Sequence, residues 1–217
     1  MEKVKSLRLI LAALFFMTLL AACQRGEKHI FYLHGRIIED QGVNAVSEQF
    51  GPYRFHDIID SLQATGAVFH YELRTPETDF NEFTARVSGQ IDSLIAAGIN
   101  PYNITVIGAS KGAVMTMRIS HLNTHPVNYV LLGANNDYVE REFDWTLHGR
   151  ILGIYEASDE LAGKNYRYWI ERSAGTAHFE ELLIETGLGH GFLYRPIDAW
   201  LVPAKNWMEN QNHGSDH

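Results

Sequence analysis

Short apolar runs rich in β-branched residues alternate along the chain with longer amphipathic or polar stretches. This alternation is typical of a parallel β-sheet with helices packed on its faces. Six runs are predicted to be strands: 29–35, 67–73, 104–107, 127–134, 151–157 and 178–185. The pattern therefore favours one α/β domain over residues 29–210, with a mostly parallel sheet of about six strands and helices on both faces.

The clearest helix is predicted between the second and third strands. Its apolar residues recur at spacings of three and four, which places them on one helical face: Phe80, Phe83, Val87, Ile91, Leu94 and Ile95. Asp79 and Glu82 form a capping-box pattern before this run, and Gly98 followed by Pro101 marks its end. Further helices are predicted over 110–123 and 196–210, followed by a polar tail, 211–217, which we expect to be frayed.

The first 22 residues have the three-part pattern of a secretory signal peptide. A basic start containing Lys3, Lys5 and Arg8 precedes an apolar run at 9–20, and small residues follow. The apolar run is too short to span a bilayer as a helix, which needs about 20 residues. Residues 1–22 are therefore predicted to be removed on export.

The apolar run ends in Leu20-Ala21-Ala22-Cys23, which resembles the lipobox of bacterial lipoproteins. The resemblance implies cleavage before Cys23, acylation of that residue, and a membrane tether formed by residues 23–28. It also implies an exported protein anchored by lipid to the cell envelope. Gln24 is not the aspartate of an inner-membrane retention signal, so in a Gram-negative host we expect the inner face of the outer membrane. The alternative is a plain buried cysteine at a cleavage-like site.

Composition excludes several classes of protein. The chain has 217 residues, of which 46% are hydrophobic, which is enough to bury one sizeable core. The net charge of -8 and the absence of a basic run argue against a nucleic-acid partner. A single cysteine excludes disulfide scaffolds and zinc fingers.

The first candidate for chemistry is the segment Gly108-Ala109-Ser110-Lys111-Gly112, between a predicted strand and a predicted helix. A GxSxG motif in that setting is the pattern of a nucleophile elbow. Small flanking residues are needed because the chain reverses within a few residues and places Ser110 on a strained, exposed turn. The turn also puts the amide of Lys111 at a helix N-terminus, where it can donate to an oxyanion.

A serine hydroxyl needs a base to act as a nucleophile, and the chain has eleven histidines. We favour His190, which lies between two glycines on a loop just beyond strand 178–185. His34, at the end of the first strand, is expected to fix a loop by hydrogen bonding. His121 and His125 are four residues apart but have no third ligand nearby in the sequence, so no metal site is predicted.

The base needs a carboxylate to orient it. Asp159 lies just past the end of strand 151–157 and is favoured for that reason, with Glu156 and Glu160 as competing acids. The chain order Ser110, Asp159, His190 is the order serine, acid, histidine of the α/β-hydrolase fold.

The first strand ends in His34-Gly35 before Arg36, which resembles the oxyanion loop of α/β-hydrolases. In that family the residue after His-Gly usually donates its amide, so the resemblance implies an oxyanion hole made by the amides of Arg36 and Lys111. Arginine departs from the small or apolar residue often found there. Its side chain either pairs with Glu39 or Asp40, or faces the pocket and favours an anionic substrate.

The sequence also departs from the family in what it lacks. The first strand follows Cys23 so closely that the antiparallel strands which usually open the fold are missing, which predicts a reduced sheet. The 16 residues between 134 and 151 suffice for one helix but not for a cap domain. The insertion at 160–177 holds Tyr166, Tyr168 and Trp169, which either pack under a loop or wall the pocket.

Together these features predict a serine hydrolase of the esterase type. Its catalytic residues would be Ser110, Asp159 and His190, and its substrate a small-molecule carboxylic ester, or a thioester or lactone, cleaved through an acyl-enzyme. No cofactor is implied. The alternative is a catalytically silent, hydrolase-like envelope lipoprotein that acts as a binding module. A peptidase is disfavoured, because nothing else in the chain could recognise peptides.

Overall fold

The computed structural model describes residues 26–209. The predicted signal peptide 1–22, Cys23 and the tail 211–217 lie outside the described residues, as does part of the tether 23–28. Between residues 26 and 209, no helix has both the length and the hydropathy that a membrane span requires.

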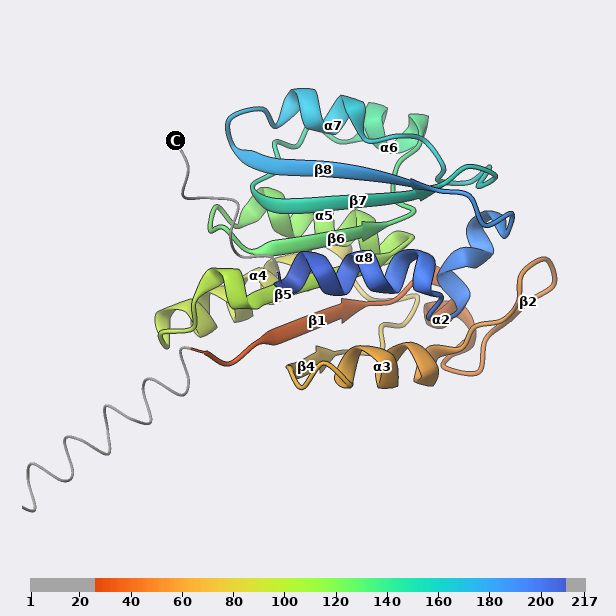
Figure 1. Ribbon diagram of the computed structural model, residues 1–217, viewed down its shortest axis with the longest axis horizontal. Helices are drawn as coiled ribbons and strands as arrows, with labels where there is room; N and C mark the ends of the chain where they lie inside the picture. Colours follow the sequence, from red (N-terminus) through yellow and green to blue (C-terminus); the bar gives the residue numbers. More distant parts are fainter. Residues whose placement is uncertain (1–25, 210–217) are drawn as a thin grey trace, which may run out of the picture.

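A six-stranded sheet in which all neighbouring strands are parallel forms the centre of the fold (Figure 1). In spatial order its strands are β4 (Val68–Tyr71), β1 (His29–Leu33), β5 (Ile104–Ala109), β6 (Asn128–Leu132), β7 (Gly149–Glu156) and β8 (Ala177–Ile184). The six predicted strands are confirmed, and each observed end lies within two residues of the predicted one. Strands β1, β5 and β6 are buried along their whole length, which explains why they read as unbroken apolar runs.

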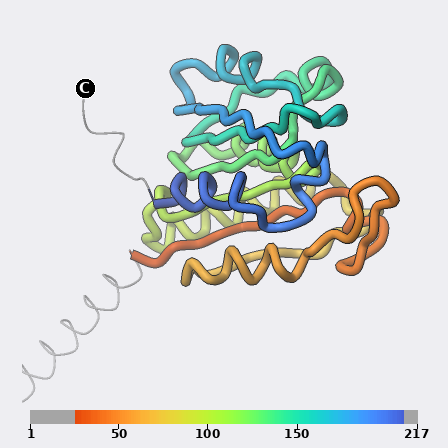
Figure 2. The backbone as a smooth tube through the Cα atoms, turned by 45° about the vertical axis from the view of Figure 1, so that its right-hand side comes forward, coloured from red at the N-terminus to blue at the C-terminus, as the bar shows by residue number. Residues whose placement is uncertain are grey.

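Helices cover both faces of the sheet. On one face, α3 (Phe55–Gln63) and α8 (Asp198–Glu209) contribute to one buried cluster, and on the other α4 (Phe80–Ala96) and α5 (Lys111–Leu122) contribute to a second. Figure 2 shows α8, in blue, running back toward the start of β1, in red, and a small pocket there is lined by both His29 and Met208.

Helix α4 begins and ends where the sequence pattern predicts. The side chain of Asp79 accepts a hydrogen bond from the amide of Glu82 at 2.8 Å and so caps the first turn. Gly98, just past the end of the helix, has a φ of +98°, a conformation that glycine adopts without steric cost. The predicted apolar face is buried toward the sheet through Phe83, Val87 and Ile91.

The remaining elements are short. They are α2 (Arg36–Gln41), the hairpin strands β2 (Val46–Ser47) and β3 (Gly51–Pro52), the 3₁₀ helix η1 (Pro101–Asn103), α6 (Asp137–Glu142), α7 (Arg167–Arg172) and the 3₁₀ helix η2 (Gly189–Tyr194). Only α6 lies between β6 and β7, so the part of the chain that the structure describes forms one domain without a cap domain there. Because the strands are parallel, the residues that follow β1, β5 and β7 meet at one edge of the sheet, on the right in Figure 1.

Candidate active site

Ser110 lies in a strained turn between β5 and α5. Its φ of 54° makes it the one residue other than glycine with a positive φ in the described range. The two glycines of the motif are required by close packing. A Cβ atom on Gly108 would lie 2.3 Å from the carbonyl oxygen of Gly112, and one on Gly112 would lie 2.0 Å from the carbonyl oxygen of Leu33.

His190 approaches Ser110 from η2, and its Nε2 lies 2.9 Å from the serine Oγ. The structure places it in a 3₁₀ helix rather than on the open loop that the sequence predicted. The flanking glycines have separate structural reasons. Gly189 has a φ of +52°, and a Cβ on Gly191 would lie 3.1 Å from the ring of Phe50, which belongs to the connection between β2 and β3.

Asp159 completes a hydrogen-bonded chain with these two residues. Its Oδ2 accepts from Nδ1 of His190 at 2.7 Å, and its Oδ1 accepts from the amides of Leu161 and Ala162 at 2.9 and 3.1 Å. Burial raises the pKa of the Asp159 carboxyl, but the interaction with His190 and the two amide hydrogen bonds outweigh burial and lower the pKa overall. Asp159 is therefore held as a carboxylate beside the imidazole.

The two competing acids have other surroundings. Glu156 is completely buried and accepts hydrogen bonds from two loops, through the backbone and hydroxyl of Ser158 and the amides of Thr186 and Gly187. Burial raises the pKa of Glu156, but these hydrogen bonds lower it below its usual value. Glu160 is exposed and lines a hollow of about 390 Å³ that Asp159 and His190 also border.

Arg36 and Lys111, whose amides are predicted to bind an oxyanion, are the first residues of α2 and α5. Amides in the first turn of a helix have no acceptor within that helix. The two helix starts lie close together, because a Cβ atom on Gly35 would be 3.6 Å from the Cβ of Ser110. The Arg36 side chain is 76% exposed, and its Nε lies 3.5 Å from the Asp40 carboxylate, so Asp40 is its partner among the two predicted acids.

A cleft of about 230 Å³ opens beside Ser110 and His190. The turn at Gly35 and Arg36 borders it, and most of its other walls are apolar: Ile37, Tyr53, Ala109, Leu161, Leu193 and Tyr194.

Of the two interpretations for the aromatic residues of segment 160–177, packing is correct for Tyr166 and Trp169. Tyr166 and Trp169 are completely buried in the cluster beneath α4 and α5. The Tyr166 hydroxyl accepts from the amide of Ala134 at 3.1 Å, and the Trp169 indole donates to Asn135 at 2.9 Å. Tyr168 packs edge-on against Trp169, with ring centroids 5.0 Å apart.

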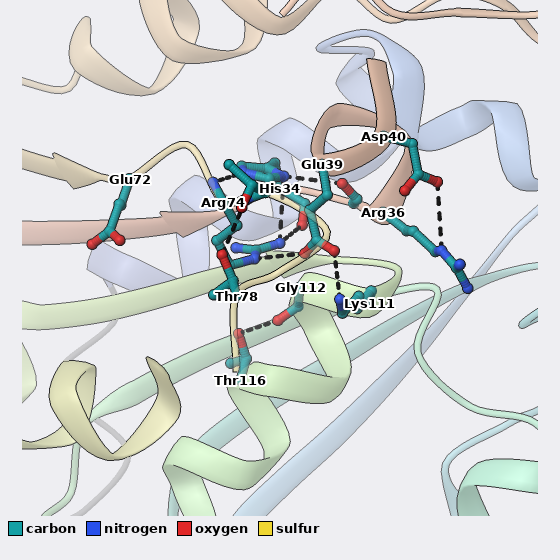
Figure 3. A network of polar contacts seen from close by, with 12 residues as sticks. His34, Arg36, Glu39, Asp40, Glu72, Arg74, Thr78, Lys111, Gly112 and Thr116 are labelled. Atoms are coloured by element: carbon teal, nitrogen blue, oxygen red, sulfur yellow. Dashed lines mark hydrogen bonds and ion pairs between the residues drawn. The ribbon is translucent and has the colours of Figure 1, made fainter. Parts of the chain in front are cut away.

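The sequence reasoning missed a buried charged cluster beside the two candidate oxyanion amides. Glu39 of α2 contacts Arg74, which follows β4, and also the ammonium group of Lys111 (Figure 3). One signal was available, since Arg74 directly follows a predicted strand and parallel strands end at the same edge of a sheet. His34, which was expected to fix a loop, lies in this cluster, and burial together with the charge of Arg74 lowers its pKa to about 4.

No model of a protein family matches the chain, and neither does any curated protein. Solved structures do match. An esterase/lipase from an uncultured bacterium is 14% identical with a TM-score of 0.56, and the match covers 86% of this chain and 77% of that one. A variant of SOBER1 from Arabidopsis thaliana is 15% identical with a TM-score of 0.52, over 84% and 98% of the two chains. A dienelactone hydrolase from Anabaena variabilis is 16% identical with a TM-score of 0.52, over 84% of each chain.

These likenesses are at the level of the fold. A single domain with a parallel six-stranded sheet flanked by helices is the arrangement that this chain shares with α/β-hydrolase structures. The chain therefore has the α/β-hydrolase fold, in a reduced form whose sheet has β4 as one edge strand.

Proposed function

We propose that the protein is a serine hydrolase that cleaves small carboxylic esters. The observation that carries the proposal is the chain of hydrogen bonds from Ser110 through His190 to Asp159, at 2.9 and 2.7 Å, on a turn with a φ of 54°. A nucleophile, a base within hydrogen-bond reach and a carboxylate that orients the base are the parts that covalent acyl transfer needs.

Acylation begins when Oγ of Ser110 attacks the ester carbonyl carbon and Nε2 of His190 takes the hydroxyl proton. Asp159 accepts a hydrogen bond from Nδ1 and stabilises the imidazolium that forms. The amides of Arg36 and Lys111 donate to the oxyanion of the tetrahedral intermediate. The bond to the leaving alcohol then breaks, and His190 returns the proton to the alcohol oxygen, which leaves an acyl group on Ser110.

Deacylation repeats these steps with water as the nucleophile. His190 takes a proton from the water as the water oxygen attacks the acyl carbon. The bond from the acyl carbon to Oγ then breaks and His190 returns the proton to Oγ, which releases the carboxylic acid and restores the Ser110 hydroxyl. No cofactor enters this sequence of steps.

The size and lining of the cleft beside Ser110 agree with a small substrate. A volume of about 230 Å³ with mainly apolar walls fits a short apolar acyl or alcohol group. A thioester or a lactone would undergo the same chemistry at this site. Names such as carboxylesterase and dienelactone hydrolase among the similar structures agree with an ester-type substrate.

The test combines active-site labelling with kinetics on short-chain model esters. A fluorophosphonate probe should label wild type but not Ser110→Ala. Ser110→Ala and His190→Ala should each lower kcat by several orders of magnitude, about 10⁴ to 10⁶-fold, and the double variant should be little worse than either, because the residues act as one unit.

Ser93→Ala is the matched control, since Ser93 is an exposed serine of α4 that hydrogen-bonds only within its own helix. It should keep full labelling and activity. Circular dichroism first establishes that every variant is folded. An unlabelled wild type that hydrolyses none of the esters would favour the silent binding module, and full activity in Ser110→Ala would remove Ser110 as nucleophile.

A further inference from the structure

A buried ionic cluster joins the two helix starts whose amides flank Ser110 (Figure 3). Glu39 is its centre and its side chain is 1% exposed. One carboxylate oxygen accepts from Nε of Arg74 at 2.8 Å, and the other pairs with the ammonium of Lys111. The three side chains come from α2, from the segment after β4 and from the start of α5. The cluster thus connects three separate parts of the chain.

The same cluster holds the residues just before Arg36. The guanidinium of Arg74 donates to the carbonyl oxygen of His34, and the Arg74 amide donates to Nε2 of His34 at 3.0 Å. Because Nε2 accepts, Nδ1 carries the proton and donates to the carbonyl oxygen of Gly35 at 3.0 Å. The turn that precedes the Arg36 amide is therefore fixed by Arg74, and also by the amide of Ile38 in α2, which donates to the carbonyl oxygen of Gly35 at 3.2 Å.

Stability alone is a weak reason for such a cluster. A buried ion pair seldom adds net stability compared with apolar side chains of similar volume, because both charges lose their hydration. The cluster does constrain the relative positions of its side chains, because displacing one of them would leave another charge without its partner. His34 is neutral above a pH of about 4, so two cations face one carboxylate beside the position of the oxyanion.

We propose that Glu39, Arg74 and the Lys111 side chain are positioning residues that hold the amides of Arg36 and Lys111 in register with each other. The proposal rests on the proposed hydrolase function. Glu39 lies three residues after Arg36 on α2, and its carboxylate pairs with the side chain of Lys111, whose amide is the second proposed donor. A shift of either helix start would break this contact, so the cluster sets the separation of the two donors before substrate arrives.

Two variants test the cluster without altering either amide. Glu39→Gln keeps the shape of the side chain but removes the charge, and Lys111→Met removes the ammonium while leaving the pair of Glu39 and Arg74 intact. Each should lower kcat by about 10 to 100-fold, less than the loss of a whole oxyanion donor, with KM little changed. Each should also weaken inhibition by an alkyl boronic acid by a similar factor, because the boronate formed on Ser110 places a negative oxygen where the oxyanion forms.

The controls separate positioning from simple destabilisation. Glu72→Gln makes the same change in an exposed carboxylate that pairs with Arg86, at 2.5 and 3.0 Å, and should leave kcat and boronate binding unchanged. Lys111→Arg retains a cation that can reach Glu39 and should restore most of the activity lost in Lys111→Met. Rates are expressed per active site titrated with a fluorophosphonate, so a partly unfolded sample does not count as a slow enzyme.

The inference is overturned if both Glu39→Gln and Lys111→Met turn over within about twofold of wild type per titrated site, whatever their melting temperatures. If Glu39→Gln does not fold, Lys111→Met and its arginine counterpart decide the question alone. Failure of the proposed function has a different signature, because wild type itself would then be unlabelled and inactive.

Discussion

Ser110 occupies a backbone conformation that side chains other than glycine rarely adopt. Such strain costs on the order of 1–3 kcal/mol and persists only where the surroundings enforce it. Here they do, because Gly108 and Gly112 are packed too closely to their neighbours to accept a Cβ atom. The conformation aims the hydroxyl at His190, so the energy stored at this residue has a direct consequence for the geometry of the site.

The choice of acid gives a prediction for a single residue. Asp159→Asn would present the imidazole with the wrong hydrogen-bonding partner and favour the wrong tautomer. In a serine protease with a Ser-His-Asp triad, the same change lowers kcat by about 10⁴-fold, and we expect a loss of similar size. Glu160→Gln serves as the matched control and should cost little, because Glu160 is exposed. Steady-state hydrolysis of a model ester distinguishes them, and the reverse ranking would move the acid to Glu160.

Among the elements, β7 and β8 have to end in register for Asp159 and His190 to meet. Eight paired positions align the two strands, and Glu156, the last residue of β7, binds the loops that follow both. The carboxylate that the sequence offered as a competing acid thus links the loop of Asp159 to the loop that leads to His190. It acts on the geometry of the site without contacting the reacting atoms.

Glu156→Gln tests this link, because an amide has one fewer oxygen to accept the loop hydrogen bonds. We expect the free energy of unfolding to fall by about 1–3 kcal/mol, as for a buried donor left unpaired, and kcat to fall by roughly tenfold. The low pKa of Glu156 means that its contribution is present at neutral pH and is lost as the pH falls below about 4.5. Urea unfolding of wild type and variant should therefore converge in acid.

The control for this prediction is Glu180→Gln, in the exposed part of β8. It should change neither stability nor kcat at neutral pH. Equal stability of Glu156→Gln and wild type at pH 7 would show that the loops are held by other contacts.

The elements also show what the sequence could predict. Strands β1, β5 and β6, which are buried on both faces, leave continuous apolar runs and were predictable from local pattern, as was α4 from its apolar face. The more exposed strands β4 and β8 were also predicted, from shorter apolar segments. Ser110, Asp159 and His190 were predictable as candidates because each follows a strand at the same edge. The position of Arg74 after a strand was a signal, but its pairing with Glu39 was not predictable, since a pairing across 35 positions leaves no periodic trace and a charged side chain normally indicates a solvated surface. The 3₁₀ geometry around His190 also depends on packing against Phe50, a contact remote in sequence.

At the scale of the whole molecule, the position of the first strand fixes which way the site faces. The chain enters the sheet at His29, at the amino end of β1, whereas Ser110 follows the carboxyl end of the neighbouring strand β5. The entry point and Ser110 therefore lie at opposite edges of the sheet. We propose that Cys23 is lipidated. The five residues between Cys23 and His29 span at most about 17–18 Å, so the lipid would lie close to the start of β1. A short tether on that edge would present the site away from the anchoring bilayer.

This orientation predicts that the anchored protein acts on esters dissolved in water and not on lipids of its own membrane. In vesicles, lipidated wild type and soluble Cys23→Ser should hydrolyse a water-soluble ester at the same rate per titrated site, because the anchor lies remote from Ser110. An ester confined to the same bilayer should gain no advantage from anchoring. A many-fold faster hydrolysis of that ester by the lipidated form would place the site against the membrane. Fractionation gives a separate check, since a Cys23→Ser protein that remains with the membranes and migrates like wild type would contradict lipidation itself.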